Sequence, residues 1–541
     1  MVKQNGLADL FPDVSDIPEA FRPAAESTQR DYLINGEIRH WPGSLLPVTS
    51  PLCTRSGGQV TPVVMGYIPR LDSRTAMQAL NAAVAAYDRG QGDWPRMPVM
   101  DRIRRVERFL EELSEHRDAV VKGLMWEVGK NLTDARREFD RTCRYIRETV
   151  EELRRLDQQP GDFGAESGTL AQLRRLPVGV VLCMGPYNYP FYETISTVIP
   201  ALIMGNAVVF KPARYGVLLI GPVLGLFQRC FPPGAINVIY GKGREILGAL
   251  MASGDVDLFA FVGTYKAAMA LSKLHPNRHR LRSVLGLDAK NPGVILPDAD
   301  LFNAVKECLS GALSFNGQRC TALKLLFVHE SVVDEFLKQL CAGVDALKVG
   351  MPWVPEVQVT PLPEAGKVEF LGALIADAVD RGARVINRCG GEYSSTLFRP
   401  AVLYPVNPLM RVYQEEQSGP LIPVVPYKDI DDVVEYVTDA DYGQQMSIFG
   451  QDPAAVAELV NQCVNQVGRI NINVQCQRGP DTLPFKGRKD SAEGALSVPD
   501  ALWVFSTRTL IAMALNEENR ALVNGLAGAG GSGSRTDQSI L

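Results

Sequence analysis

Residues 178–262 contain, in chain order, the runs Val178-Gly-Val-Val-Leu182, Ala207-Val-Val-Phe210, Ala235-Ile-Asn-Val-Ile239 and Leu258-Phe-Ala-Phe-Val262. Continuous apolar runs bounded by Gly and Pro are typical of strands that are buried on both faces. When such strands alternate with helical patterns, they predict a parallel α/β sheet, and a dinucleotide-binding domain is the default for that architecture. We therefore expect a Rossmann-like cofactor-binding domain over residues 178–290.

A second βα series follows this domain. Its apolar runs are Pro292-Gly-Val-Ile-Leu296, Leu325-Leu-Phe-Val328, Arg384-Val-Ile386 and Leu421-Ile-Pro-Val-Val425. This series predicts a separate α/β catalytic domain over residues 291–470, with the active site between the two domains. Before the first domain, residues 74–156 place apolar side chains three and four apart, which indicates helices. We assign residues 1–165 to an N-terminal extension and the helical part of the cofactor-binding domain.

The remaining segments connect or flank these domains. Residues 170–176 and 502–511 are patterned as strands outside either sheet, so we expect a small β oligomerisation element from residues 166–177 and 501–515. Residues 471–500 form a return segment with a substrate loop. Residues 525–534 are rich in Gly, Ala and Ser, which predicts a flexible C-terminal tail over residues 516–541.

Composition excludes several functional classes. The 541 residues are 46% apolar and carry 56 Lys and Arg against 61 Asp and Glu, a net charge of −5 that disfavours nucleic acid as a partner. The longest apolar run, residues 217–227, is interrupted by Pro222 and is shorter than the ~18 residues that a membrane span needs. Without a secretory pattern at residues 1–14, we expect a cytoplasmic protein with reduced cysteines. The ten Cys include no Cys-x-x-Cys pair, so no metal site is expected.

One cysteine stands in a context that suits chemistry. The stretch Phe315-Asn-Gly-Gln-Arg-Cys320-Thr-Ala places a Cys beside an Arg in a polar turn after a helical stretch, where a thiolate is stabilised. A single Cys is by itself more often a small buried core residue. Five further stretches accompany it: Gly179–Pro190, Lys211-Pro-Ala-Arg214, Phe261-Val-Gly263-Thr264, Gln414–Pro420 and Pro484–Ser491. In this order they resemble the aldehyde dehydrogenase superfamily, over roughly residues 63–512.

Within that superfamily the chain is most similar to the non-phosphorylating, NADP-dependent glyceraldehyde-3-phosphate dehydrogenases of glycolysis, through the Cys320 stretch and Asn473-Val-Gln-Cys-Gln-Arg478-Gly-Pro-Asp481. The resemblance implies an aldehyde dehydrogenase fold and a homotetramer or homodimer. It also implies that Cys320 attacks the aldehyde carbon, and that the Asn188 amide and the Cys320 backbone N–H hold the oxyanion. Hydride transfer to NADP and hydrolysis of a cysteine thioester intermediate would follow.

The sequence departs from the family at the general base. The family supplies a Glu from Glu-Leu-Gly-Gly-Lys, whereas this chain reads Leu285-Gly-Leu-Asp-Ala-Lys290, with Gly286 at the position of the Glu. Asp288 lies two residues on, which in an extended strand places it on the same side but about 6.5 Å away. Asp288 is therefore a candidate base, and the alternative is a solvated or hydrogen-bonded turn residue.

The cofactor contacts are also implied by the resemblance. Lys211 follows a strand where the superfamily uses a Lys on the adenosine ribose, and Arg214 replaces a Glu of NAD-using members and attracts a 2′-phosphate. Glu416 aligns with the carboxylate that holds the nicotinamide ribose; the alternative is a surface acid. The other expected contacts are Gly241, in a partial glycine loop, and Gly263 and Thr264.

Four residues are expected to bind the substrate phosphate. By resemblance these are Arg141, Tyr189, Arg319 and Arg478. Desolvated guanidiniums beside a thiolate need partners, and a phosphate dianion supplies three oxygens. For Arg141 the alternative is a helix-surface salt bridge with neighbouring charges. Two other functions remain open because the Glu is absent: a CoA-acylating aldehyde dehydrogenase, and a catalytically impaired cofactor-binding member of the superfamily.

Overall fold

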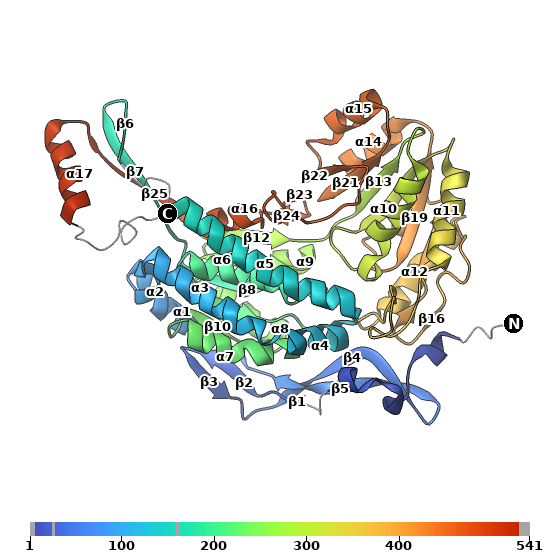
Figure 1. The fold of residues 1–541 in the computed structure, drawn as a ribbon, viewed down its shortest axis with the longest axis horizontal. Helices are drawn as coiled ribbons and strands as arrows, with labels where there is room; N and C mark the ends of the chain where they lie inside the picture. The colour runs from blue at the N-terminus through green and yellow to red at the C-terminus, as the bar shows by residue number, and fades with distance from the viewer. Residues whose placement is uncertain (1–5, 24–26, 158–162, 530–541) are drawn as a thin grey trace.

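The four apolar runs of residues 178–262 form adjacent strands of one sheet (Figure 1). In the computed structural model, which describes residues 6–23, 27–157 and 163–529, they are β8 (Val180–Met184), β9 (Ala207–Lys211), β10 (Ile236–Val238) and β11 (Leu258–Val262). Together with β12 (Arg282–Gly286) they pair in parallel. Almost all side chains of β8 to β11 are buried, whereas β12 begins with the exposed Arg282. The expected parallel α/β sheet is confirmed.

This sheet has eight strands, because three further strands join its edges. The order is β24-β12-β11-β8-β9-β10-β2-β3, and the outer strands β2 (Asp31–Ile34), β3 (Glu37–His40) and β24 (Ala492–Glu493) pair antiparallel. The N-terminal extension therefore completes the cofactor-domain sheet, which the sequence did not predict. A separate sheet, β1-β5-β4, contains β1 (Ser27–Thr28), β4 (Leu45–Ser56) and β5 (Gln59–Pro69).

Helices form the predicted N-terminal layer and pack against the sheet. Those up to residue 272 are α1 (Ser73–Tyr87), α2 (Asp93–Arg96), α3 (Val99–Ser114), α4 (Arg117–Val128), α5 (Leu132–Asp157), α6 (Tyr192–Ile203), α7 (Gly221–Cys230), α8 (Gly243–Ala252) and α9 (Tyr265–Ser272). Every residue of α6 is buried. This matters for the site, because α6 begins just after Asn188.

The second βα series forms a seven-stranded sheet of order β15-β18-β19-β14-β13-β21-β22. Its strands are β13 (Asn291–Ile295), β14 (Leu323–His329), β15 (Arg384–Val385), β18 (Ala401–Tyr404), β19 (Leu421–Tyr427), β21 (Gln445–Phe449) and β22 (Arg469–Ile472). Its helices are α10 (Leu301–Leu313), α11 (Val333–Asp345), α12 (Lys367–Asp380), α13 (Arg411–Gln414), α14 (Ile430–Asp439) and α15 (Pro453–Cys463). Short pairs β16 (Tyr393–Ser394) with β17 (Leu397–Phe398), and β20 (Tyr442–Gly443) with β23 (Arg488–Lys489), complete the strands.

A three-stranded sheet projects from the body at the upper left of Figure 1. It consists of β6 (Gly164–Glu166), β7 (Thr169–Pro177) and β25 (Ser506–Ala514), with β25 antiparallel to β7. Two expectations need correction here. The strand pattern from Leu502 onward was wrong for its first residues, because α16 (Val498–Val504) buries Leu502 against the core. The expected tail instead contains helix α17 (Glu517–Ala529), and residues 530–541 lie outside the described residues.

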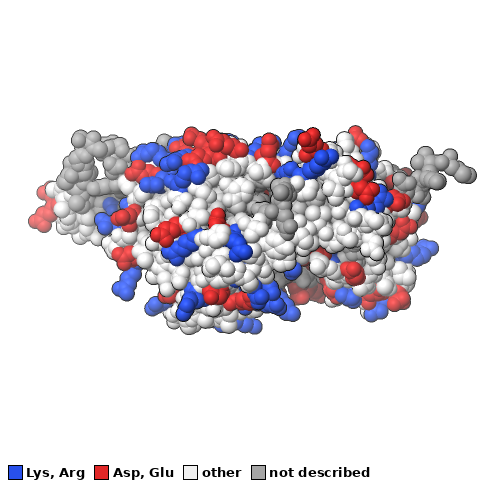
Figure 2. Space-filling view, turned by 90° about the horizontal axis from the view of Figure 1, so that it is seen from below, with Lys and Arg blue, Asp and Glu red and all other residues white. Residues whose placement is uncertain are grey.

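The surface carries both signs of charge. Lys and Arg side chains alternate with Asp and Glu over the face in Figure 2, without a continuous basic patch on that face. Among the described residues, no helix combines the length and apolar character needed to cross a lipid bilayer.

Candidate active site

Cys320 lies between the end of α10 and the start of β14, after a tight turn that its sequence motif explains. Phe315, Asn316 and Gly317 have φ values of 49°, 55° and 69°, three successive left-handed residues. A Cβ on Gly317 would lie 2.6 Å from the Ala312 carbonyl oxygen, so only glycine fits there. The Asn316 side chain holds the turn by donating to the Thr360 carbonyl and accepting from its N–H, both at 3.0 Å.

This turn exposes the thiol in a cavity of about 920 Å³ between the two large domains. Asn188 lines the same cavity, and its Nδ2 donates to the Gln318 carbonyl at 2.7 Å. The Asn188 amide therefore lies next to the segment that carries Cys320. Its N–H is already hydrogen-bonded to Gln318, so it would have to turn to reach an oxyanion at Cys320. Burial, with the negative charge of Glu193 second, raises the pKa of the Cys320 thiol, while Lys324 opposes the shift.

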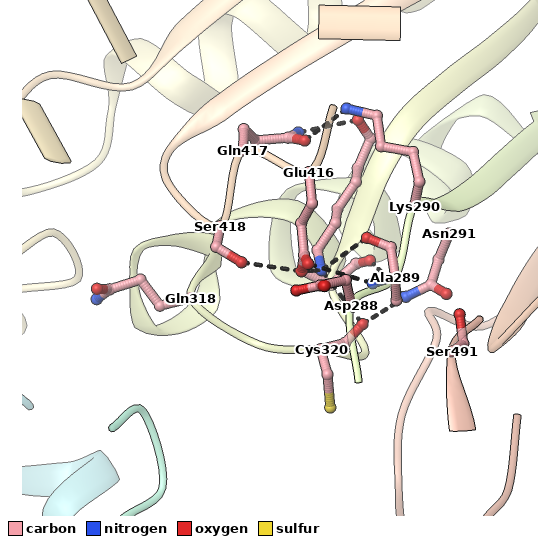
Figure 3. A network of polar contacts seen from close by, with 12 residues as sticks. Asp288, Ala289, Lys290, Asn291, Gln318, Cys320, Glu416, Gln417, Ser418 and Ser491 are labelled. Carbon is pink, nitrogen blue, oxygen red and sulfur yellow. Dashed lines mark hydrogen bonds and ion pairs between the residues drawn. The ribbon is translucent and has the colours of Figure 1, made fainter. Parts of the chain in front are cut away.

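Glu416 and Asp288 form an acidic group behind Cys320 (Figure 3). Glu416 is ion-paired with Lys324, and it accepts from the Ser418 hydroxyl at 2.9 Å and the Ala289 N–H at 3.2 Å. Asp288 accepts from the Tyr265 N–H at 2.8 Å, and burial followed by the charge of Glu416 raises its pKa to about 6. In Figure 3 the sulfur of Cys320 points away from this group. The structure therefore places Asp288 in the cavity, but beside Glu416.

Gly286 ends β12 and also lines the cavity. The atoms nearest to a Cβ built there belong to the Val262 side chain, with Cγ1 at 3.4 Å and Cγ2 at 3.5 Å, which is ordinary van der Waals contact. The position has room for a side chain, so packing does not force the glycine.

The predicted cofactor residues fall into two groups. Arg214, Gly263, Thr264 and Glu416 line the cavity with Cys320, whereas Lys211 and Gly241 do not. Lys211 is buried, its Nζ donates to the Pro212 carbonyl at 2.9 Å, and burial lowers its pKa to about 8. Arg214 is exposed.

These residues fit a dinucleotide phosphate. The buried ammonium of Lys211 has no carboxylate partner among the described residues, and an anion would supply one. Gly243, at the N-terminus of α8, lies beside Lys211: a Cβ there would be 3.0 Å from Leu247 Cδ1 and 4.0 Å from Lys211 Cε. Exposed Arg214 adds a second cation that can meet the 2′-phosphate.

The four predicted phosphate-binding residues all line the cavity, but two are already ion-paired. Arg478 is buried and pairs with Glu193, and Arg141 makes a bidentate pair with Asp481 at 3.0 and 2.7 Å. The helix-surface alternative for Arg141 is wrong, because neighbouring Asp140 pairs with Arg117 instead. Asp481 neutralises Arg141 from the return segment.

Arg319 and Tyr189 complete this end of the cavity. Arg319 Nη2 donates to the carbonyls of Ser310 and Gly311 at the end of α10, at 3.2 and 2.8 Å. Its Nε is buried without a hydrogen-bond partner among the described residues. Tyr189 stacks under the ammonium of Lys130, which lies 3.4 Å from the ring centroid. The expectation that all three guanidiniums need a phosphate as partner is therefore wrong, since carboxylates already pair with Arg478 and Arg141.

Sequence reasoning missed three charged residues of the site: Glu193, Lys324 and Lys130. A signal was available for the first two. Glu193 lies within the otherwise uncharged segment Tyr192–Ile203, and Lys324 is the one charge in the strand Leu323–His329 apart from its last residue, His329. A charged residue inside a buried element is almost always paired, which marks both positions.

Comparisons with known proteins identify the family of this chain. The model of the aldehyde dehydrogenase family matches residues 58–510. An NADP-dependent glyceraldehyde-3-phosphate dehydrogenase from Streptococcus equinus is 30% identical over 82% of this chain and 92% of its own length. A 4,4'-diapolycopene aldehyde oxidase from a Methylomonas species is 30% identical over 76% of this chain and 77% of its own length. The structure of an NADP-dependent glyceraldehyde-3-phosphate dehydrogenase from Bacillus halodurans, complexed with NADP, superposes with a TM-score of 0.81 at 30% identity, covering 91% of this chain and all of that one.

Proposed function

This chain belongs to the aldehyde dehydrogenase family, and we propose that it oxidises glyceraldehyde 3-phosphate, or a similar phosphorylated aldehyde, to the free acid with NADP. One observation carries the proposal: Cys320 and Asn188 share a single cavity with Arg141, Tyr189, Arg319 and Arg478. The names of two similar proteins, from Streptococcus equinus and Bacillus halodurans, support this substrate and cofactor.

The chemistry begins at the thiol. Cys320 loses its proton and attacks the aldehyde carbon, and the Asn188 amide turns from the Gln318 carbonyl to hold the oxyanion together with the Cys320 N–H. When bound, the nicotinamide of NADP would supply the acceptor for the hydride. Cys320 then carries the acyl group as a thioester, which water hydrolyses to the acid and the free thiol.

The substrate phosphate would meet the guanidinium nitrogens that have no hydrogen-bond partner. Both Arg319 Nε and Arg478 Nε are buried in this state among the described residues, although Arg478 Nε lies 3.7 Å from Asp481. Charge-assisted bonds to phosphate oxygens satisfy such donors. Arg141 and the Tyr189 hydroxyl would complete the set.

On the cofactor side, Lys211 and Arg214 would hold the adenosine ribose and its 2′-phosphate. Gly241, Gly263 and Thr264 would line the remaining path, and Glu416 would bind the nicotinamide ribose after exchanging hydrogen bonds with Lys324 and Ser418. We further propose a cytoplasmic homo-oligomer, tetramer or dimer. The exposed Leu173 and Leu510 on the projecting sheet support such an assembly.

A second candidate is the oxidation of an uncharged aldehyde. The pairing of Arg478 with Glu193, and of Arg141 with Asp481, favours it, because this end of the cavity then has less positive charge to offer a dianion. The similarity to a 4,4'-diapolycopene aldehyde oxidase points in the same direction.

One assay tests these proposals. NADPH formation is measured with glyceraldehyde 3-phosphate and with glyceraldehyde, each with and without CoA, and the product is identified. The proposal requires the acid as product and a kcat/KM at least about tenfold higher for the phosphorylated aldehyde, the contribution of one charged bond. A preference for glyceraldehyde would support the second candidate. A CoA-dependent thioester would indicate the acylating reaction, and the absence of turnover would indicate an impaired member.

A further inference from the structure

Hydrolysis of the thioester needs a base, and Gly286 supplies none. The carboxylates that line the cavity with Cys320 include those of Glu193, Asp288 and Glu416. The last two lie on the side from which the Cys320 sulfur points away, and their oxygens accept hydrogen bonds from Lys324, Ser418 and backbone N–H groups (Figure 3). Both therefore belong to the cofactor end of the cavity.

Glu193 occupies the opposite, substrate end. It is in the first turn of α6, five residues after Asn188, and its side chain is 9% exposed. One oxygen, Oε2, accepts from Arg478 Nη1, whereas Oε1 makes no hydrogen bond to any described residue. The cavity that contains Cys320 is therefore lined by a buried carboxylate that has one oxygen without a hydrogen bond to any described residue.

The start of α6 brings Glu193 towards the reacting sulfur: Glu193 follows Asn188 by five residues, and the Asn188 amide donates at 2.7 Å to the carbonyl of Gln318, two residues before Cys320. The negative charge of Glu193 comes second, after burial, among the causes that raise the pKa of the Cys320 thiol. Because the interaction between charges weakens with distance, this agrees with Glu193 and Cys320 lining the same cavity.

We propose that Glu193 is the general base of deacylation, in place of the carboxylate missing at position 286. Oε1 accepts a proton from a water molecule as its oxygen attacks the thioester carbonyl carbon. The tetrahedral intermediate then collapses, the C–S bond breaks, and its electrons leave with the Cys320 sulfur. The products are the carboxylic acid and the thiolate. This inference rests on the thioester of the proposed function but not on the identity of the aldehyde.

Arg478 has a positioning role in this scheme. Its guanidinium contacts the rings of Tyr192 and Phe485, 4.7 Å from each ring centroid. These contacts fix Arg478, which in turn orients the Glu193 carboxylate. The guanidinium also supplies the counter-charge that a buried carboxylate needs.

The test uses p-nitrophenyl acetate, which acylates a thiolate without NADP or a phosphorylated aldehyde. Glu193→Gln keeps the side-chain volume and an acceptor for Arg478. We expect the burst of nitrophenolate to be unchanged, because acylation persists. The steady-state rate of nitrophenolate release, which depends on deacylation, should fall at least about 100-fold, since a general base contributes a factor of about 10²–10⁴ to the rate. The acidic limb of the pH profile for release should disappear.

Glu415→Gln is the matched control, because Glu415 lines the same cavity but pairs with the exposed Arg411. Its release rate should equal that of the unaltered protein. If Glu193→Gln does not fold, Glu193→Asp retains the charge and should show slower release with the acidic limb intact. The proposal is overturned if a folded Glu193→Gln releases product at the normal rate, or if Asp288→Asn alone removes the acidic limb. Failure to oxidise glyceraldehyde 3-phosphate would refute the proposed substrate and leave this result intact.

Discussion

Arg319 offers the cleanest test of phosphate recognition. Its Nε is buried without a partner among the described residues, while its Nη2 donates to backbone carbonyls at the end of α10 and to Gln475. A phosphate oxygen on Nε would form a charged hydrogen bond, worth about 1.5–3 kcal/mol. Replacing Arg319 with Met removes that bond and keeps most of the side-chain bulk.

The expected cost to the fold is small. No carboxylate is left unpaired by Arg319→Met, and the lost interaction with the C-terminal carbonyls of α10 is worth about 0.3–1 kcal/mol. Truncation of Arg478 would instead leave the buried Glu193 without its counter-ion, at about 3–5 kcal/mol. A substitution of Arg319 therefore tests phosphate binding with a smaller loss of stability than a substitution of Arg478.

The assay compares two aldehydes that differ only in the phosphate. Arg319→Met should raise KM for glyceraldehyde 3-phosphate by about one to two decades, which is 1.5–3 kcal/mol, and leave the oxidation of glyceraldehyde nearly unchanged. Thermal unfolding of the variant confirms that the fold survives. Equal losses on both aldehydes would show that Arg319 supports the turn around Cys320 and not a phosphate, and would refute the reasoning.

Further predictions concern the nucleophile, the cofactor and the buried ion pair. Cys320→Ser should abolish aldehyde oxidation in a steady-state NADPH assay but leave NADP binding intact; turnover in this variant would contradict the assignment. Arg214→Glu should weaken NADP binding by about one to two decades relative to NAD, measured as a ratio of Kd values; an unchanged ratio would place Arg214 outside the 2′-phosphate site. The pKa of Lys211 is lowered to about 8, so its charge is present below that pH and lost above it, and the Kd for NADP should rise as the pH increases through 8. Lys211→Gln should lose that pH dependence in the same titration. Arg478→Ala should lower Tm markedly, whereas Arg478→Ala with Glu193→Ala should recover part of the loss; no recovery would mean that the pair does not govern the stability of this region.

The sequence predicted the two large sheets because most of their strands are continuous apolar runs bounded by Gly and Pro. It did not predict that β2 and β3 would complete the first sheet, since β3 has the charged, largely exposed sequence Glu-Ile-Arg-His and β2 pairs with β10 at the single register position Val238↔Leu33. The stretch Leu502-Trp-Val-Phe favours a strand locally, so the sequence predicts one from Leu502 onward. In the structure Leu502 belongs instead to α16, whose N-terminus Ser497 caps by accepting from the Asp500 N–H, and it is buried against the core.

At the site, the motif residues could be proposed one by one, but their charge partners could not. Glu193 and Arg478 are far apart in the sequence, and only the packing of the return segment against α6 brings them together. Sequence patterning reports the period of an element and the exposure of its faces, and it carries no information about which charge meets which. The pairing of Arg141 with Asp481 instead of a neighbour on its own helix has the same origin.

The return segment carries Arg478 and Asp481 away from the second sheet and then adds β24 to the first. The ion pairs at the substrate end of the cavity therefore also fasten the two domains together. Any change of substrate preference that removes one of these charges loosens the junction as well. Evolution of a new specificity in this scaffold would have to exchange charges in pairs, because each single step costs stability before a new substrate gains affinity.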